Sequence, residues 1–93
     1  MEDKILTLHP DKGKSGRRVS KDRYETVRGA LVRCLHSGPL THADLMRCAT
    51  ATLVGFDGSI TWYAETVKLD LEARGIIERI ATKPETYRLA GGE

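Results

Sequence analysis

The chain has little of what marks a membrane protein, a secreted disulfide-rich domain or an aromatic-rich core. Its 93 residues include one tryptophan, one phenylalanine, three tyrosines and two cysteines. No apolar run approaches the roughly 20 residues that a transmembrane helix needs, and the acidic N-terminus lacks a signal-peptide pattern. We therefore expect a cytoplasmic protein with an aliphatic core and no membrane contact.

Sequence signs of catalysis are also lacking. His9, His36 and His42 are scattered, and no nucleophile and base are paired at a useful spacing. The DKGKSGR stretch, residues 11–17, resembles a phosphate-binding loop but lacks the G-x-x-x-x-G-K-[ST] spacing. We expect no enzyme activity, no catalytic residues and no cofactor.

The two cysteines, Cys34 and Cys48, have no C-x-x-C spacing and lie in expected helices. A structural disulfide is not expected in a reducing compartment. A zinc site with His36 and His42 is the alternative, but Cys34 and His36 are two apart on a helix and point in different directions. We expect buried thiols and no metal.

The net charge of +2 conceals an uneven distribution. Residues 12–23 carry six basic groups and one acid, whereas residues 24–93 carry eight basic and nine acidic groups. The six are Lys12, Lys14, Arg17, Arg18, Lys21 and Arg23. Such a basic, glycine-containing arm can contact phosphates, and a solvated lead-in that aids solubility is an equal alternative.

Apolar periodicity and capping residues predict three helices. We expect them over residues 20–36, 41–54 and 59–74, with N-caps at Ser20, Thr41 and Ser59 and a stop at Gly75. Strands are expected over residues 4–8, at Leu40, and over 76–80 and 86–89, the last two joined as a hairpin. We divide the chain into an extended basic arm (1–19), a folded domain (20–90) and a disordered tail (91–93).

The WYAETVKLDLEARGIIER stretch, residues 62–79, predicts a helix that passes directly into a β-branched strand. Leu71 would fill the core, Gly75 would reverse the chain, and one of Ile76 and Ile77 would cover the core. The LDLEARGIIER part resembles the junction between helix 3 and the wing in winged-helix regulators. That resemblance implies an α+β fold, a winged helix-turn-helix with a three-helix core, a short two-stranded wing and an N-terminal extended arm.

More closely, the chain is similar to a group of small, uncharacterised bacterial proteins. The similarity rests on Trp62-Tyr63, on Val67 to Gly75 and on Leu8-His9-Pro10, which give a WY…VKLDLEARG core and an LHP segment. It implies a winged-helix-like fold and supplies no catalytic residues.

A helical wheel divides the third helix into a core stripe and an outward face. Ile60, Ala64, Val67 and Leu71 fall on the core stripe. The outward face carries Trp62, Leu69 and Ala73, with Thr66 beside them and Glu65 and Glu72 on the other flank. An apolar patch flanked by acids is poorly suited to a DNA groove, because the acids weaken the attraction to phosphates.

Two functions compete on this basis. The first is binding of nucleic acid, with duplex DNA as the partner, and its residues would be Arg17, Arg18, Lys21, Arg23, Thr61, Lys68, Arg79, Lys83 and Arg88. The alternative is a protein-interaction or homodimerisation module without DNA binding, whose interface would be Trp62, Leu69, Leu6 and Leu8. We expect the Trp62 patch to be buried, either under the N-terminal segment or in a homodimer.

Overall fold

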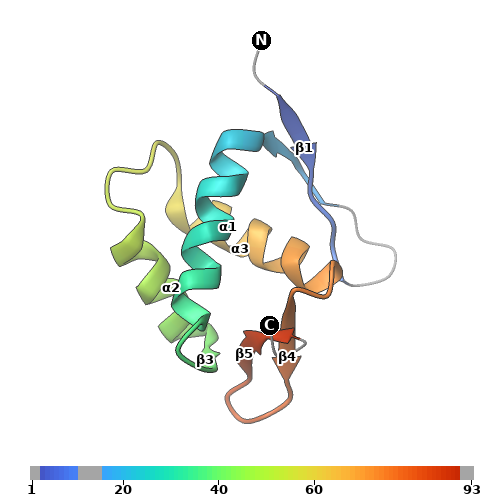
Figure 1. The fold of residues 1–93 in the computed structure, drawn as a ribbon, viewed down its shortest axis with the longest axis vertical. Helices are drawn as coiled ribbons and strands as arrows, with labels where there is room; N and C mark the ends of the chain where they lie inside the picture. Colours follow the sequence, from blue (N-terminus) through green and yellow to red (C-terminus); the bar gives the residue numbers. More distant parts are fainter. Residues whose placement is uncertain (1–2, 11–15, 91–93) are drawn as a thin grey trace.

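The computed structural model describes residues 3–10 and 16–90 as an α+β fold with three helices and two small antiparallel sheets. The expectations for Lys12 and Lys14 and for residues 91–93 fall outside these residues. Figure 1 shows the helices between the two sheets, with β1 at one end of the molecule and β3, β4 and β5 at the other. No helix of the described part is long and apolar enough to cross a membrane.

The helices begin where their capping residues predict. The elements are α1 (Lys21–Leu35), α2 (His42–Thr52) and α3 (Ile60–Ala73). The side chains of Ser20, Thr41 and Ser59 accept hydrogen bonds from the backbone N–H groups three residues later, which stabilises each first turn. Gly75 follows α3 with φ of +77°, a conformation that favours glycine, so the predicted stop is confirmed.

The core is aliphatic, as expected. Leu31 of α1, Leu45 of α2 and Leu71 of α3 are fully buried at its centre. Ile77 and Tyr87 cover this core from the sheet beside it. The periodicity that predicted the helices therefore also identified the faces that pack together.

The three-stranded sheet has the order β3-β5-β4. The hairpin of β4 (Ile77–Ile80) and β5 (Thr86–Leu89) was predicted within one residue, and β3 (Leu40–Thr41) pairs with β5 through Leu40 and Tyr87. This pairing joins the part of β5 next to the turn to the residues that lead directly into α2.

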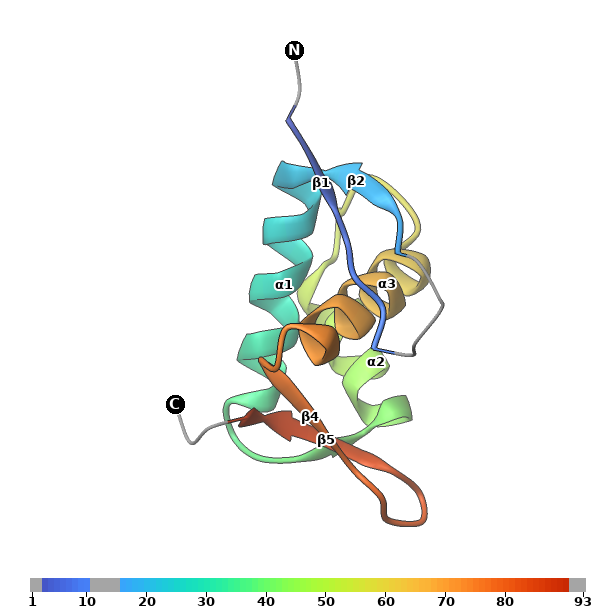
Figure 2. The same cartoon turned by 90° about the vertical axis from the view of Figure 1, so that its right-hand side faces the viewer.

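The N-terminal residues form a second hairpin that the sequence analysis did not predict. Strand β1 (Lys4–Leu6) pairs with β2 (Arg18–Ser20), placing Ile5 opposite Val19. The expected boundary between arm and domain at residue 19 thus falls inside β2, and Val19 is part of the core. In Figure 2 the chain continues from β1 across the front of α3.

The expectation of free thiols is wrong. Cys34 of α1 and Cys48 of α2 form a disulfide with Cα atoms 6.0 Å apart. The reason is the packing of α1 against α2, which sets the two side chains opposite one another. This bond also removes the two thiolates that the zinc alternative required.

Candidate functional site

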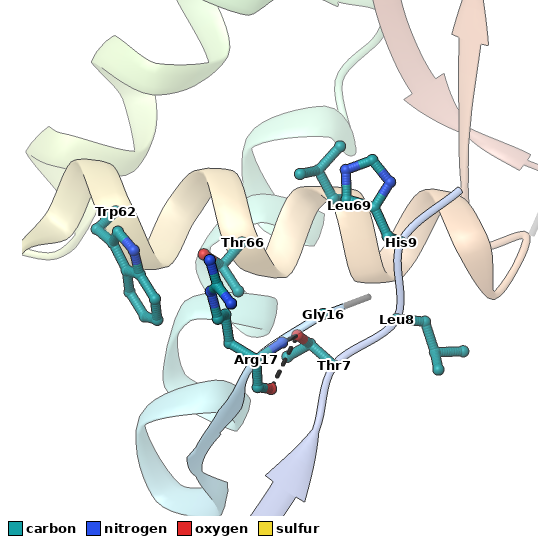
Figure 3. Close-up of a pocket in the computed structure, with 8 residues that line it drawn as sticks. All are labelled: Thr7, Leu8, His9, Gly16, Arg17, Trp62, Thr66 and Leu69. Carbon is teal, nitrogen blue, oxygen red and sulfur yellow. Dashed lines mark hydrogen bonds between the residues drawn. The ribbon is translucent and has the colours of Figure 1, made fainter. Parts of the chain in front are cut away.

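A depression of about 230 Å³ lies on the outward face of α3, beside the N-terminal hairpin. Trp62, Thr66 and Leu69 of α3 form one side of it. The other side is Thr7, Leu8, His9, Gly16 and Arg17. Figure 3 shows the Arg17 side chain reaching across to Thr66, with Trp62 and Leu69 on either side. The depression therefore combines an aromatic ring, an aliphatic side chain, a hydroxyl and a guanidinium.

Thr7 and Arg17 hold the two halves of the N-terminal hairpin together beyond its strands. The backbone N–H of Thr7 donates to the carbonyl of Arg17 at 2.8 Å. The Thr7 hydroxyl donates to the same carbonyl at 3.0 Å and accepts from the Arg17 N–H at 2.7 Å. A Cβ on Gly16 would lie 2.0 Å from the Thr7 carbonyl oxygen, so this approach requires glycine. These contacts fix the point from which the Arg17 side chain leaves the hairpin.

Asp70, on α3, attaches this hairpin to the helices. Its carboxylate is fully buried and accepts a hydrogen bond from the backbone N–H of Leu8 at 2.8 Å. The hydroxyl of Tyr24 and the Nε of Arg74, the latter at 2.9 Å, also donate to it. Burial, followed by the hydrogen bond to Asp70, raises the pKa of Tyr24 to about 12. One carboxylate thus joins α1, α3 and the N-terminal segment.

Residues 3–10 and 16–90 do not provide the expected covering of the Trp62 patch. Leu8 borders the depression, but Leu8 is 41% exposed and Leu6 is 54% exposed. Trp62 itself is 43% exposed, and its ring meets that of Tyr63 edge-on at 4.9 Å. The Trp62 ring is therefore supported by a neighbouring ring and open to solvent.

Among the cations expected to contact nucleic acid, the three beside the N-terminal hairpin and the start of α1 that are exposed are Arg17, Arg18 and Lys21. Arg17, Arg18 and Lys21 make no salt bridge to any carboxylate of residues 3–10 and 16–90. Arg23 differs, because its guanidinium lies 2.7 Å from the Asp57 carboxylate. Hydrogen bonds to Tyr63 and to Asp57 raise the pKa of Arg23. Arg23 is therefore already paired with a carboxylate and is less available to a phosphate than the other three cations.

Lys68, expected to contact nucleic acid, and Glu72, expected to flank the outward face of α3, are both enclosed. Lys68 is 3% exposed, its Nζ lies 2.7 Å from a Glu72 oxygen, and it stands 4.1 Å above the ring of Tyr87. Arg79 approaches the other oxygen of Glu72 at 3.0 Å. The reason is the β4–β5 hairpin, which folds over this side of α3 and encloses the charges. Lys68 is therefore a structural cation, remote from an external phosphate.

The remaining predicted residues are dispersed. Arg88 donates to Glu78 at 2.7 Å across β4 and β5. Lys83 is exposed in the turn between these strands, and Thr61 is exposed in the first turn of α3. Of the nine residues expected to contact nucleic acid, only Arg17 lines the depression.

Thr7, Thr66 and Asp70 were not predicted from the sequence as parts of the site. Thr66 was noted only as a neighbour of the patch, and its spacing from Trp62 and Leu69 places it on the same face. Asp70 gave no signal of its own, because an aspartate near a helix end usually faces solvent. Within the described residues, no group of three or more histidine, cysteine, aspartate or glutamate side chains could hold a metal ion.

Comparisons with known proteins place the chain in a family without transferring a function to it. Searches of curated proteins and of solved structures return no match. A family model, described as a family of unknown function (DUF6958), matches residues 4–87. That span includes the N-terminal hairpin, the three helices and most of the β4–β5 hairpin. The chain belongs to this family of unknown function, DUF6958.

Proposed function

We propose that the protein is a nucleic-acid-binding module built on a winged-helix arrangement. The order α1, β3, α2, α3 and a final hairpin is the order of that fold, with β4–β5 as the wing. The β3-β5-β4 sheet at its base supports the same assignment. Because folds of this kind serve several functions, the proposal depends on the surface.

The observation that carries the proposal is the position of three exposed cations that form no salt bridge with the described carboxylates. Arg17, Arg18 and Lys21 lie where the N-terminal hairpin meets α1, and Arg17 reaches the open face of α3. Unpaired exposed cations release counterions from phosphates on binding, which is the main source of affinity for nucleic acids. Arg17 lies beside the polar Thr66 and the aromatic Trp62, side chains that suit contact with bases.

Burial of Glu72 supports the proposal as well. The acid flank expected on α3 is reduced, because Glu72 is enclosed with Lys68 and Arg79. Glu65 stays exposed and lies 3.8 Å from Nε2 of His42. The outward face therefore presents fewer negative charges to a phosphate backbone than the sequence implied.

Fluorescence anisotropy with labelled DNA and RNA oligonucleotides over a salt series tests the proposal. We expect affinity that rises steeply as salt falls. Arg17→Ala and Arg18→Ala should each weaken binding several-fold and reduce the salt slope by about 1. Arg33→Ala, the same charge change at the other end of α1, is the matched control and should leave binding unchanged. No binding at low salt to any oligonucleotide would refute the proposed function.

A protein interface at the same face is the second candidate, because Trp62 is exposed beside Leu69. Light scattering coupled to size exclusion distinguishes a homodimer from a monomer. A dimer that Trp62→Ala converts to a monomer would favour this candidate. A wild-type monomer at all concentrations would remove the homodimer from consideration.

A further inference from the structure

The N-terminal segment obstructs the usual docking of α3. Residues Thr7 to His9 cross this helix, and the Leu8 N–H is hydrogen-bonded to the buried Asp70. An α-helix with its side chains is about 10–12 Å across, and the major groove of DNA is about 12 Å wide. The groove accepts a helix but has no room for a second chain segment lying across it. Duplex DNA is therefore a poor fit to this face.

The same crossing creates a site of a different shape. It closes one end of the α3 face and leaves the depression between Trp62 and Arg17. Every base has a π-face, so an exposed indole binds bases without requiring a particular sequence. A base inside a duplex has its faces covered by its neighbours, whereas an unpaired base does not.

We propose that this depression binds one unpaired nucleotide of a single strand, an inference that rests on the proposed function. The base stacks on the Trp62 indole, and the Thr66 hydroxyl lies beside it as a hydrogen-bonding group for the base edge. The phosphate of the nucleotide contacts the Arg17 guanidinium, a charge-assisted contact. Leu69 lines the apolar wall of the site.

Two neighbouring cations extend this site along the bound nucleic-acid strand. Arg18 and Lys21 follow Arg17 in the chain, where β2 passes into α1, and both are exposed. They would contact phosphates adjacent to the stacked nucleotide. An aromatic platform with cations near it is the arrangement by which single strands are held without regard to sequence.

Trp62 is the only tryptophan of the chain, so its fluorescence reports the site directly. Oligothymidylate and oligouridylate are titrated into the wild-type protein at low salt, and a duplex of equal length is titrated in parallel. We expect a single strand to quench Trp62 emission and to bind at least about 10-fold more tightly than the duplex. Preference for either the deoxy or the ribo strand supports the site and identifies its natural polymer.

Variants test the stacking. Measured by fluorescence anisotropy of a labelled oligonucleotide, Trp62→Ala should lower single-strand affinity about 10-fold or more, and Trp62→Phe should retain part of it. Val54→Ala is the control, because Val54 is another large exposed apolar side chain, at the end of α2. If Trp62→Ala does not fold, the Trp62→Phe variant and quenching in the wild type decide.

The outcomes separate this inference from the proposed function. Equal or tighter binding of the duplex, or single-strand binding without change in Trp62 emission, would overturn the nucleotide site and leave nucleic-acid binding intact. Unaltered affinity in both Trp62 variants would have the same meaning. Failure to bind single strands and duplexes alike would overturn both.

Discussion

The backbone N–H of Leu8 donates a hydrogen bond of 2.8 Å to the carboxylate of Asp70, a residue 62 positions away in the chain. The carboxylate is fully buried and is shared with Tyr24 and Arg74. Because this contact holds the N-terminal segment across α3, it determines the shape of the candidate site.

Replacing Asp70 should therefore destabilise the fold. Asp70→Ala leaves the Tyr24 hydroxyl and the Leu8 N–H without their acceptor, and we expect a loss of about 3 kcal/mol in the free energy of unfolding. Asp44→Ala removes an exposed carboxylate that pairs with Arg47 and should cost less than about 1 kcal/mol. Urea unfolding of both variants makes the comparison, and equal losses would contradict the role given to Asp70.

Two glycines should respond to alanine in opposite directions. Gly16→Ala places a Cβ 2.0 Å from the Thr7 carbonyl oxygen, so the hairpin must shift, at a cost of about 1–3 kcal/mol. Gly29 lies within α1 with nothing within 4 Å of its would-be Cβ, and Gly29→Ala should stabilise by about 0.5–1 kcal/mol. Thermal unfolding should show a lower Tm for Gly16→Ala and a higher Tm for Gly29→Ala. Faster hydrogen exchange of the Thr7 amide in Gly16→Ala would show that the loss of stability arises in the hairpin.

The helices and the β4–β5 hairpin could be predicted because their signals are local. Ser20, Thr41 and Ser59 cap helices whose apolar spacing follows directly, and Gly75 ends the last of them. Such signals depend on neighbours within a few residues, so the sequence contains them in full.

The candidate site depends on contacts between distant residues and was mostly hidden. Lys68 and Glu72 are four residues apart on α3, a spacing typical of a solvated ion pair. They are buried because the β4–β5 hairpin, which contains Tyr87, packs over them. The pairing of β1 with β2 likewise has no strong local pattern, because each strand has three residues. The wheel identified Trp62 and Leu69 on the outward face, and both line the depression.

Breaking the Cys34–Cys48 bond should lower stability. The bond closes a loop with a sequence separation of 14, for which loop-closure entropy gives about 3 kcal/mol. We expect a reductant to lower the Tm of the wild type. The Cys34→Ala/Cys48→Ala double variant should have a low Tm that reductant leaves unchanged. A wild-type Tm that is insensitive to complete reduction, verified by thiol titration, would refute this expectation.

Alkaline pH should destabilise the protein through Tyr24. Burial and the hydrogen bond to Asp70 raise its pKa from 10.0 to about 12, so the native state favours the protonated phenol. The resulting stability is present below about pH 10 and is lost as pH rises towards about 12. Tyrosinate absorbance should show one late-titrating group that Tyr24→Phe removes. Loss of a different titration step in that variant would contradict the assignment.

The long reach of the Leu8–Asp70 hydrogen bond also bears on how the chain is made. During synthesis the N-terminal segment emerges first, yet the residue that anchors it follows 62 positions later. Closing so long a loop is entropically costly, and α1 and α2 are complete before Asp70 has been added. The segment around Leu8 therefore cannot reach its native place until Asp70 has been added.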